Sequence, residues 1–148
     1  MASRGKLTQG VKIYLDDNSG TPRDITCDLI DIPETGITYA EVDMTGVCNT
    51  VANYLAGLGT AGSTLKGAMN DTATTGFYTI LAGLAVNQVV TLTAEYGDDA
   101  SAPTTGSPTF GGEYVMMGFK VSNDGGKMVC EAEVKPTGAV APAWGVKA

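Results

Sequence analysis

The chain has 148 residues and a formal net charge of −7, from 16 acidic and nine basic side chains, and it contains no histidine. An acidic chain repels phosphate, which disfavours nucleic-acid binding by counterion release, and the lack of histidine removes the usual general base and zinc ligand. No apolar run is long enough to span a membrane, and no apolar segment follows the basic N-terminus, so we expect neither membrane insertion nor a signal peptide.

The remaining composition is typical of one mainly β domain. The chain is 43% apolar and contains 20 glycines, which suits strands and long loops better than helices. Its three cysteines, Cys27, Cys48 and Cys130, are an odd number without the close spacing of a metal or disulfide motif. We interpret them as buried, reduced thiols of a protein that folds in a reducing cytoplasm.

Alternating apolar and polar residues predict four strands in the first half of the chain. They span 11–17, 23–32, 37–45 and 63–71, and the second of them places Ile25, Cys27 and Leu29 on one face. Residues 46–62 are rich in glycine, and they predict a long loop with at most a turn or two of helix.

One α-helix is predicted at about residues 75–87. Apolar residues recur there at positions 77, 80, 81, 84 and 85, which form one stripe on a helix. Thr74 or Thr75 can cap its start, and Asn87 marks its end. No residue from 72 to 88 is charged, so the helix packs either on its own sheet alone or also against a neighbouring subunit.

The last third of the chain predicts a strand at 89–96, a loop at 97–111 and an antiparallel hairpin of strands 113–121 and 127–135. A turn at Asp124-Gly125 places Ser122 opposite Lys127. One face of this hairpin is then apolar, with the pairs Val121–Met128, Phe119–Cys130, Met117–Ala132 and Val115–Val134. The other face is polar and carries Lys120, Glu131, Glu133 and Lys135.

No residues suggest catalysis, a metal site or a cofactor. Neither a phosphate-binding loop nor a nucleophile with a base is present, and the Asp16–Cys27 segment lacks the glycine and glutamate of a calcium loop. The pairs Glu41/Asp43 and Glu131/Glu133 have a spacing that glycosidases use, but no aromatic residues gather around them. We therefore expect that the protein is not an enzyme.

The order of elements, together with ITYAEVDMT at 37–45, LKGAMND at 65–71 and the stretch 110–138, resembles the tail tube (major tail) proteins of long-tailed bacteriophages. ITYAEVDMT at 37–45 resembles that family's strand of an acidic residue, an apolar residue, Asp, an apolar residue and Thr. LKGAMND at 65–71 is similar to the strand after its long loop, and 110–138 to its final aromatic-rich strand, a further strand and Pro-Thr-Gly. The similarity spans nearly the whole chain except 139–148.

The resemblance implies a single domain, residues 1–148, with a β-sandwich or partial barrel flanked by one helix. Six-membered rings of such domains stack into a hollow tube, which guides the tape-measure protein during assembly and the double-stranded genome during ejection. The expected location is the virion tail, assembled in the host cytoplasm. The expected partners are other copies, the tape-measure protein, and the tail terminator and distal tail proteins, with DNA passing through without specific binding.

The candidate lining of the tube lumen is the polar hairpin face. Its residues are Glu131, Glu133, Lys120 and Lys135, with Glu95 on an adjacent strand. Carboxylates there would repel DNA phosphates and make the lumen acidic. The alternative is that this face is turned outward to solvent.

Three segments are candidate contacts between subunits. The 46–62 loop, with Val51, Tyr54 and Leu55, would dock on the next ring. The N-terminal arm 1–10 and the C-terminal arm 139–148 would contact neighbouring subunits. In the N-terminal arm, Arg4 and Lys6 would form ion pairs with Asp98 and Asp99. In the C-terminal arm, Trp144 would be the contact residue, and we expect that this arm can be removed without unfolding the protein.

Other readings remain open at this point. The chain could be a related virion protein, such as a tail terminator, a capsid decoration protein or a secretion-system tube. It could also be a monomeric β-sandwich binding module, but only 7% of its residues are aromatic and they are spread along the chain.

Overall fold

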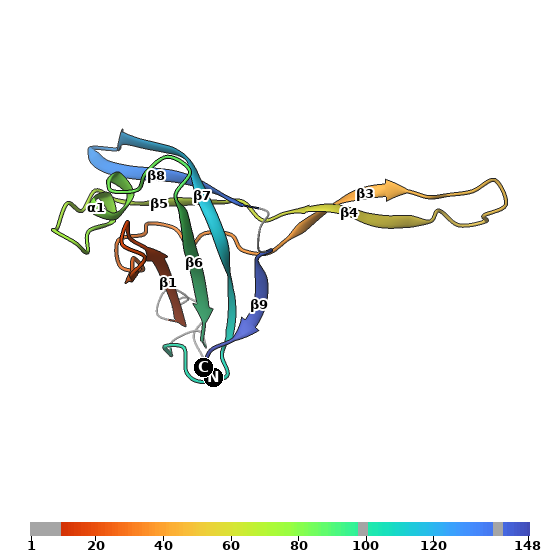
Figure 1. The fold of residues 1–148 in the computed structure, drawn as a ribbon, viewed down its shortest axis with the longest axis horizontal. Coiled ribbons are helices and arrows are strands. Elements are labelled where there is room, and N and C mark those ends of the chain that lie inside the picture. The colour runs from red at the N-terminus through yellow and green to blue at the C-terminus, as the bar shows by residue number, and fades with distance from the viewer. Residues whose placement is uncertain (1–9, 98–100, 138–140) are drawn as a thin grey trace.

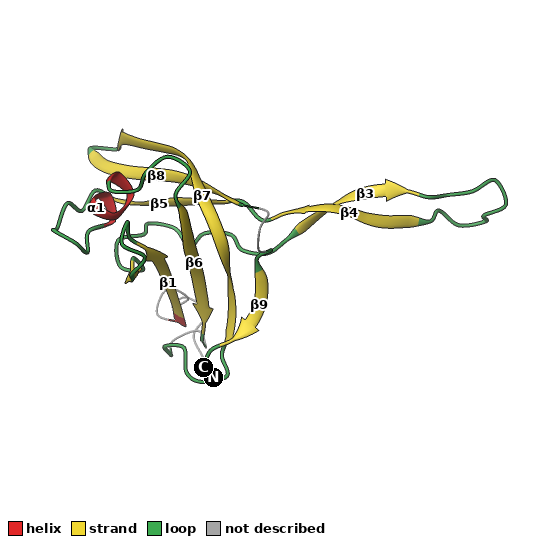
Figure 2. Cartoon of the chain, in the orientation of Figure 1, coloured by secondary structure: helices red, strands yellow, loops and turns green. Residues whose placement is uncertain are grey.

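The computed structural model describes residues 10–97, 101–137 and 141–148, and it has two unlike parts. One is a body built on a bent antiparallel sheet of seven strands, and the other is a two-stranded arm that projects far from the body (Figure 1). Among the described residues, regular structure is almost entirely strand, with one short α-helix (Figure 2). The mainly β prediction is confirmed.

The body sheet has the strand order β2-β1-β6-β7-β8-β5, and β9 pairs with β7. The body strands are β1 (Val11–Asp16), β2 (Pro22–Asp24), β5 (Ser63–Ala68), β6 (Val89–Tyr96), β7 (Pro108–Asp124), β8 (Lys127–Pro136) and β9 (Ala143–Val146). The arm consists of β3 (Thr38–Asp43) and β4 (Tyr54–Thr60), and the helix α1 spans Phe77–Ala82. The strands predicted at 11–17, 37–45, 63–71 and 89–96 are confirmed, with small differences at their ends.

The long strand β7 joins the two halves of the body. Its first part pairs with β6 and β9, and its last part pairs with β8. Because β7 bends between these parts, β1 and β6 lie opposite β5 and β8 and enclose one apolar core. Both halves supply fully buried side chains to it, among them Ile13, Leu15, Leu65 and Ala132.

Helix α1 covers one side of this core and contacts β5 and β8. Phe77, Ile80 and Leu81 are buried, as the stripe predicts. The helix is shorter than predicted, and the expected threonine cap is wrong, because its N-cap residue is Gly76. The Asp28 carboxylate caps it instead and accepts a hydrogen bond from the Phe77 amide at 3.2 Å.

The strand predicted at 23–32 ends at Asp24. The Asp24 carboxylate accepts hydrogen bonds from the amide and the hydroxyl of Thr26, at 2.9 and 2.6 Å, and the backbone then turns. The turn breaks the alternation, so Ile25 is buried but Cys27 is exposed. Cys48 is exposed as well, so the prediction of buried thiols is correct only for Cys130.

The long loop predicted at 46–62 is wrong in its second half, which forms β4 and pairs antiparallel with β3. The strand was missed because neither face of the arm packs on a core, so its apolar residues need not alternate. Its glycines also suggest a loop. In the arm they allow close cross-strand packing, since a Cβ on Gly59 would lie 3.0 Å from Cε1 of Tyr39.

Residues 143–146, within the expected C-terminal arm, form a strand of the body. Trp144 lies opposite Phe110, and Pro142 packs so closely on Gly112 that a Cβ there would lie 2.7 Å from the Pro142 Cα. Within the subunit this segment is therefore part of the sheet rather than a separate arm, and its contact with neighbouring subunits stays a prediction. Its short length and the glycine at 145 concealed the strand.

Candidate assembly surfaces

The hairpin of β7 and β8 turns at Gly125 and Gly126, whose φ angles are 60° and 87°. A two-residue hairpin turn with positive φ at both central positions matches the twist of the strands, and two glycines adopt it without strain. Asp124 therefore lies opposite Lys127, and the predicted register is wrong by two residues. Since side chains alternate with a period of two, such a shift leaves every residue near the turn on its predicted face.

A β-bulge at Met117 changes the faces farther along β7. Gly118 lies opposite Glu133, but Met116 lies opposite Val134, so Met117 has no partner. An unpaired extra residue reverses the alternation that follows it. Tyr114 therefore points into the core, where it is 1% exposed, and Met117 is 60% exposed, so the predicted pairs Met117–Ala132 and Val115–Val134 are wrong.

The polar side of the hairpin, which we call the polar face, holds the four charged residues predicted for it. Strand β5 adds Lys66, which lies opposite Glu131, and the turn adds Asp124 and Lys127. Lys66 was not predicted for this face, because the pairing of β5 with β8 joins segments far apart in the chain. The charged residues of the polar face are Lys66, Lys120, Asp124, Lys127, Glu131, Glu133 and Lys135.

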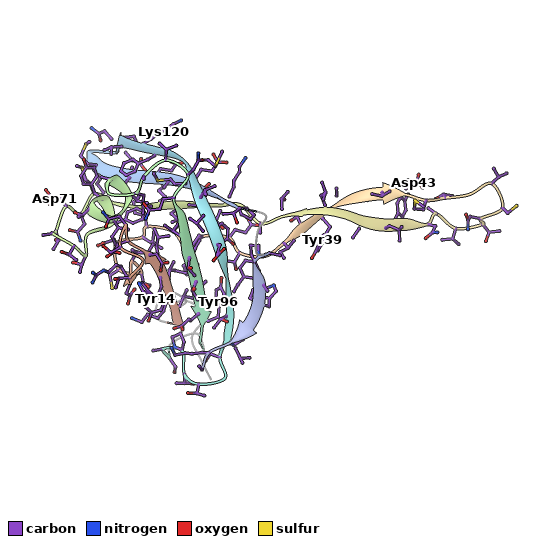
Figure 3. All side chains as sticks on the ribbon, in the orientation of Figure 1. Tyr14, Tyr39, Asp43, Asp71, Tyr96 and Lys120 are labelled. Atoms are coloured by element: carbon purple, nitrogen blue, oxygen red, sulfur yellow. The ribbon has the colours of Figure 1, made fainter. Side chains whose placement is uncertain are left out.

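The charges of the polar face are close enough to interact. The Lys66 Nζ lies 3.4 Å from Asp124 Oδ2, and the Lys135 Nζ lies 3.5 Å from Glu133 Oε1. Figure 3 shows Lys120 on the side of the hairpin away from the rest of the body. These side chains are partly or fully exposed, so their ion pairs contribute little to folding stability and stay available to a passing molecule.

Glu95, the fifth residue of the candidate lining, lies in a different environment. It is only 9% exposed, and Lys147, just beyond β9, covers it with its Nζ 3.0 Å from the carboxylate. Glu95 is therefore paired within the subunit.

The arm displays apolar side chains on both of its faces. Val42 and Leu55 are opposite each other on one face, and Asp43 and Tyr54 on the other. No residue of β3 or β4 is buried. Figure 3 shows Tyr39 and Asp43 on the arm, well away from the body. The exposed large apolar residues of the arm and its tip include the three predicted there, and they are Tyr39, Val42, Met44, Val47, Val51, Tyr54, Leu55 and Leu58.

The root of the arm is fixed to the body by hydrogen bonds from two successive residues. The Ser63 hydroxyl donates to the Glu34 carbonyl oxygen at 2.7 Å, and the Thr35 hydroxyl is hydrogen-bonded to the Tyr96 hydroxyl. These bonds set the direction in which the arm leaves the body.

Trp144 lies on the sheet next to two other aromatic residues. Its ring centroid is 4.8 Å from that of Phe110 and 6.0 Å from that of Tyr96. One side of the indole thus packs on the body, yet Trp144 remains 57% exposed. Arg4, Lys6, Asp98 and Asp99 lie outside the described residues.

The described residues show no arrangement typical of an active site. They contain no group of three or more carboxylates and thiols that could hold a metal ion, and no buried side-chain polar atom among them lacks a hydrogen-bond partner. No helix within the described part of the chain has the length and hydropathy of a membrane span.

No protein-family model and no curated protein sequence matches the chain. Solved structures do share its fold. A chain in the virion of a native gene transfer agent particle is 17% identical, with a TM-score of 0.65 over 96% of this chain and 99% of that one. A chain in the tail of an empty gene transfer agent particle, solved with C6 symmetry, is 16% identical, with a TM-score of 0.61 over the same shares.

A third similar chain comes from the sheath-tube complex, in its extended state, of the extracellular contractile injection system PVC. It is 14% identical, with a TM-score of 0.60 over 99% of this chain and all (100%) of that one. The similarity covers the body and the arm together, because so little of either chain is left out. The chain therefore has the fold of the tail tube proteins.

Proposed function

We propose that this protein is a structural subunit whose copies assemble into six-membered rings, and that the rings stack into the hollow tail tube of a phage-like particle. The observation that carries the proposal is the fold, which is shared over nearly the full length with a chain of a C6-symmetric tail and with a chain of a sheath-tube complex. In this role the protein binds copies of itself and catalyses no reaction.

The arm supports the proposal. An isolated two-stranded hairpin is marginally stable in water, and exposed apolar patches mark interaction surfaces. The arm shows both features, since the described part of the subunit covers neither of its faces. A neighbouring subunit in the same ring or the next one would cover Val51, Tyr54 and Leu55.

Open sheet edges in the body support it too. The last part of β7 pairs only with β8, and β9 pairs only with β7, among the described strands. Unpaired edges invite further strands, and a closed ring removes them by placing each edge against a neighbour.

The polar face is the proposed lining of the lumen. Glu131 and Glu133 would turn carboxylates toward the passing double-stranded DNA and oppose adhesion of its phosphates. In this arrangement the tape-measure protein occupies the same channel during assembly, and the terminator and distal tail proteins meet the ends of the tube in the virion.

Negative-stain electron microscopy of the purified protein, concentrated stepwise and paired with light-scattering mass, tests the proposal. We expect rings and hollow tubes of one diameter. Single rings that never stack, even when preformed tube ends are added as seeds, would indicate a terminator instead. A protein that stays monomeric under the same seeding would contradict the proposal.

The native cysteines report on the arm without any mutation. Cys48 lies near the arm tip and Cys27 on the body, and both are exposed in the subunit, whereas burial raises the pKa of the Cys130 thiol. A maleimide should therefore label Cys27 and Cys48 but not Cys130 in the subunit. In tubes the labelling of Cys48 should fall at least about tenfold; equal labelling in both states would contradict docking of the arm tip.

A further inference from the structure

The polar face differs in charge from the rest of the protein. The residues that pair between β5 and β8 and between β7 and β8 include four lysines and three carboxylates on this face, a net charge of +1, although the whole chain has −7. The lining predicted from the sequence had three carboxylates and two lysines, but Glu95 is paired with Lys147 within the subunit. Strand β5 and the hairpin turn add Lys66, Asp124 and Lys127. Lysine is therefore in the majority on the surface that the proposed tube turns toward DNA.

The carboxylates are placed between the lysines. Glu131 lies on the central strand β8, directly opposite Lys66 of β5 on one side and Lys120 of β7 on the other. Side chains opposite each other on neighbouring strands have Cβ atoms about 5 Å apart, well within the screening length at physiological salt. Glu133 in turn lies 3.5 Å from Lys135. Each of the two glutamates thus has at least one lysine beside it, across the strands for Glu131 and along β8 for Glu133.

Without these carboxylates, the lysines of the polar face would form a surface that binds a polyanion. DNA carries about one charge per 1.7 Å of its axis, and lysines that neutralise phosphates release counterions and gain affinity for any sequence. Lys66, Lys120 and Lys135 stand on three adjacent strands of one exposed surface, where a duplex could reach them together.

We infer that Glu131 and Glu133 are charge-cancelling residues: they neutralise the lysines of the polar face and so keep this surface from holding the phosphates of double-stranded DNA. The relevance to DNA passage rests on the proposed function, but the cancellation belongs to the surface of each subunit. The face is then non-adhesive through balance of charges rather than through an excess of negative charge.

The test is the double variant Glu131→Gln/Glu133→Gln, titrated against a fluorescent duplex of about 20 base pairs. Removing two charges raises the net charge of the face from +1 to +3. We expect binding at 50 mM salt at least about tenfold tighter than that of the unaltered protein. Because each added phosphate contact steepens the salt dependence by about 0.9, two contacts should weaken that binding about twelvefold between 50 and 200 mM salt.

Two further variants make the result specific. The control variant Glu41→Gln/Asp43→Asn changes the net charge by the same amount, but on the arm, where residues 37–62 contain no lysine or arginine. This control should bind the duplex no better than the unaltered protein does. Adding Lys66→Gln and Lys120→Gln to the double variant should return binding to the unaltered level. Equal melting temperatures would exclude unfolding as the source of any binding.

The inference is overturned if the folded double variant binds no tighter than the unaltered protein, or if the arm control binds as tightly as the double variant. The titration uses the subunit, so its outcome does not depend on assembly. A protein that never forms rings or tubes refutes the proposed function, whereas a duplex titration without the expected gain refutes only the role of Glu131 and Glu133.

Discussion

The body and the arm of this protein follow opposite rules. In the body, side chains such as Leu65, Tyr114 and Ile13 are almost completely buried, and the buried polar atoms of the described residues are hydrogen-bonded. In the arm, no strand residue is buried, although Tyr39, Val42 and Leu55 are as apolar as the residues of the core. The packing that stabilises the folded subunit therefore lies in the body. In the proposed tube, the apolar residues of the arm would stabilise contacts with neighbouring subunits.

This difference matters for the proposed function, because the subunit leaves the apolar residues of the arm exposed. A monomeric binding module would need to keep such an arm soluble on its own, whereas an assembling subunit covers it with neighbours. The experiments below separate the two regions, beginning with the largest expected difference.

Hydrogen exchange should show the largest contrast. Amides of β6 and β8 should open only with global unfolding, which costs about 5–15 kcal/mol in typical domains, while those of β3 and β4 should open at almost no cost. Mass spectrometry of peptides from 38–60 and from 127–136 measures both. Assembly into tubes should slow exchange in the arm. Equal protection of the two regions in the subunit would contradict the view that only the body is stably folded on its own.

Matched leucine truncations should show the next largest effect. Leu65→Ala removes a fully buried side chain and should lower the free energy of unfolding by about 2–5 kcal/mol. Leu55→Ala, on the arm, removes one that is 55% exposed and should change it by less than about 0.5 kcal/mol. Denaturant unfolding measures both. We expect Leu55→Ala to impair tube formation, so a stable variant that assembles normally would contradict the role of Leu55.

Deleting residues 141–148 tests whether the end of the chain belongs to the body. The deletion uncovers Phe110 and leaves the Glu95 carboxylate without Lys147, so we expect a loss of about 2–4 kcal/mol in thermal unfolding. Val146→Ala, at an exposed position of the same strand, is the control and should have little effect. A truncated protein of unchanged stability would instead support the sequence-based expectation that this arm can be removed without unfolding the subunit.

The body was largely predictable from the sequence, and the reason is its core. Apolar residues alternate in strands 11–17 and 89–96 and recur every three or four residues in the helix, because one side of each element is buried. Such periodicity is the sequence signal of burial. Strands β4 and β9 escaped prediction, and neither has a core face of its own. Strand β3, the partner of β4 in the arm, does alternate in sequence and was predicted. Periodicity could place Leu55 in an exposed segment but could not show that the segment is a strand.

The hairpin illustrates a second limit. Its turn lies at Gly125-Gly126 rather than Asp124-Gly125, and both dipeptides are good turn formers. The bulge at Met117 has no clear signal, because Met116 and Met117 are equally suited to either face. The polar residues near the turn were assigned correctly, since a shift by two residues preserves the faces, whereas pairing across to Lys66 depends on the tertiary fold.

Acid titration gives the smallest expected effect, and it again separates the regions. In the body, the Asp17 carboxyl has a lowered pKa because it accepts hydrogen bonds from the amide of Thr21, from Arg23 and from the amide of Ser19. In the arm, hydrogen bonds from Thr45 lower the pKa of the Asp43 carboxyl. A carboxyl whose folded pKa lies below its usual 3.8 adds stability above that pH and loses it as the pH falls toward the folded pKa. Asp17→Asn should therefore be less stable than the unaltered protein at neutral pH, with the difference shrinking below about pH 4.

Asp43→Asn should leave global unfolding unchanged at every pH, because the arm opens before the body unfolds, and should alter only exchange at the arm tip. If Asp43→Asn shifted the acid unfolding midpoint as much as Asp17→Asn, the arm would have to fold cooperatively with the body, and its apolar residues would then contribute to subunit stability as well as to assembly.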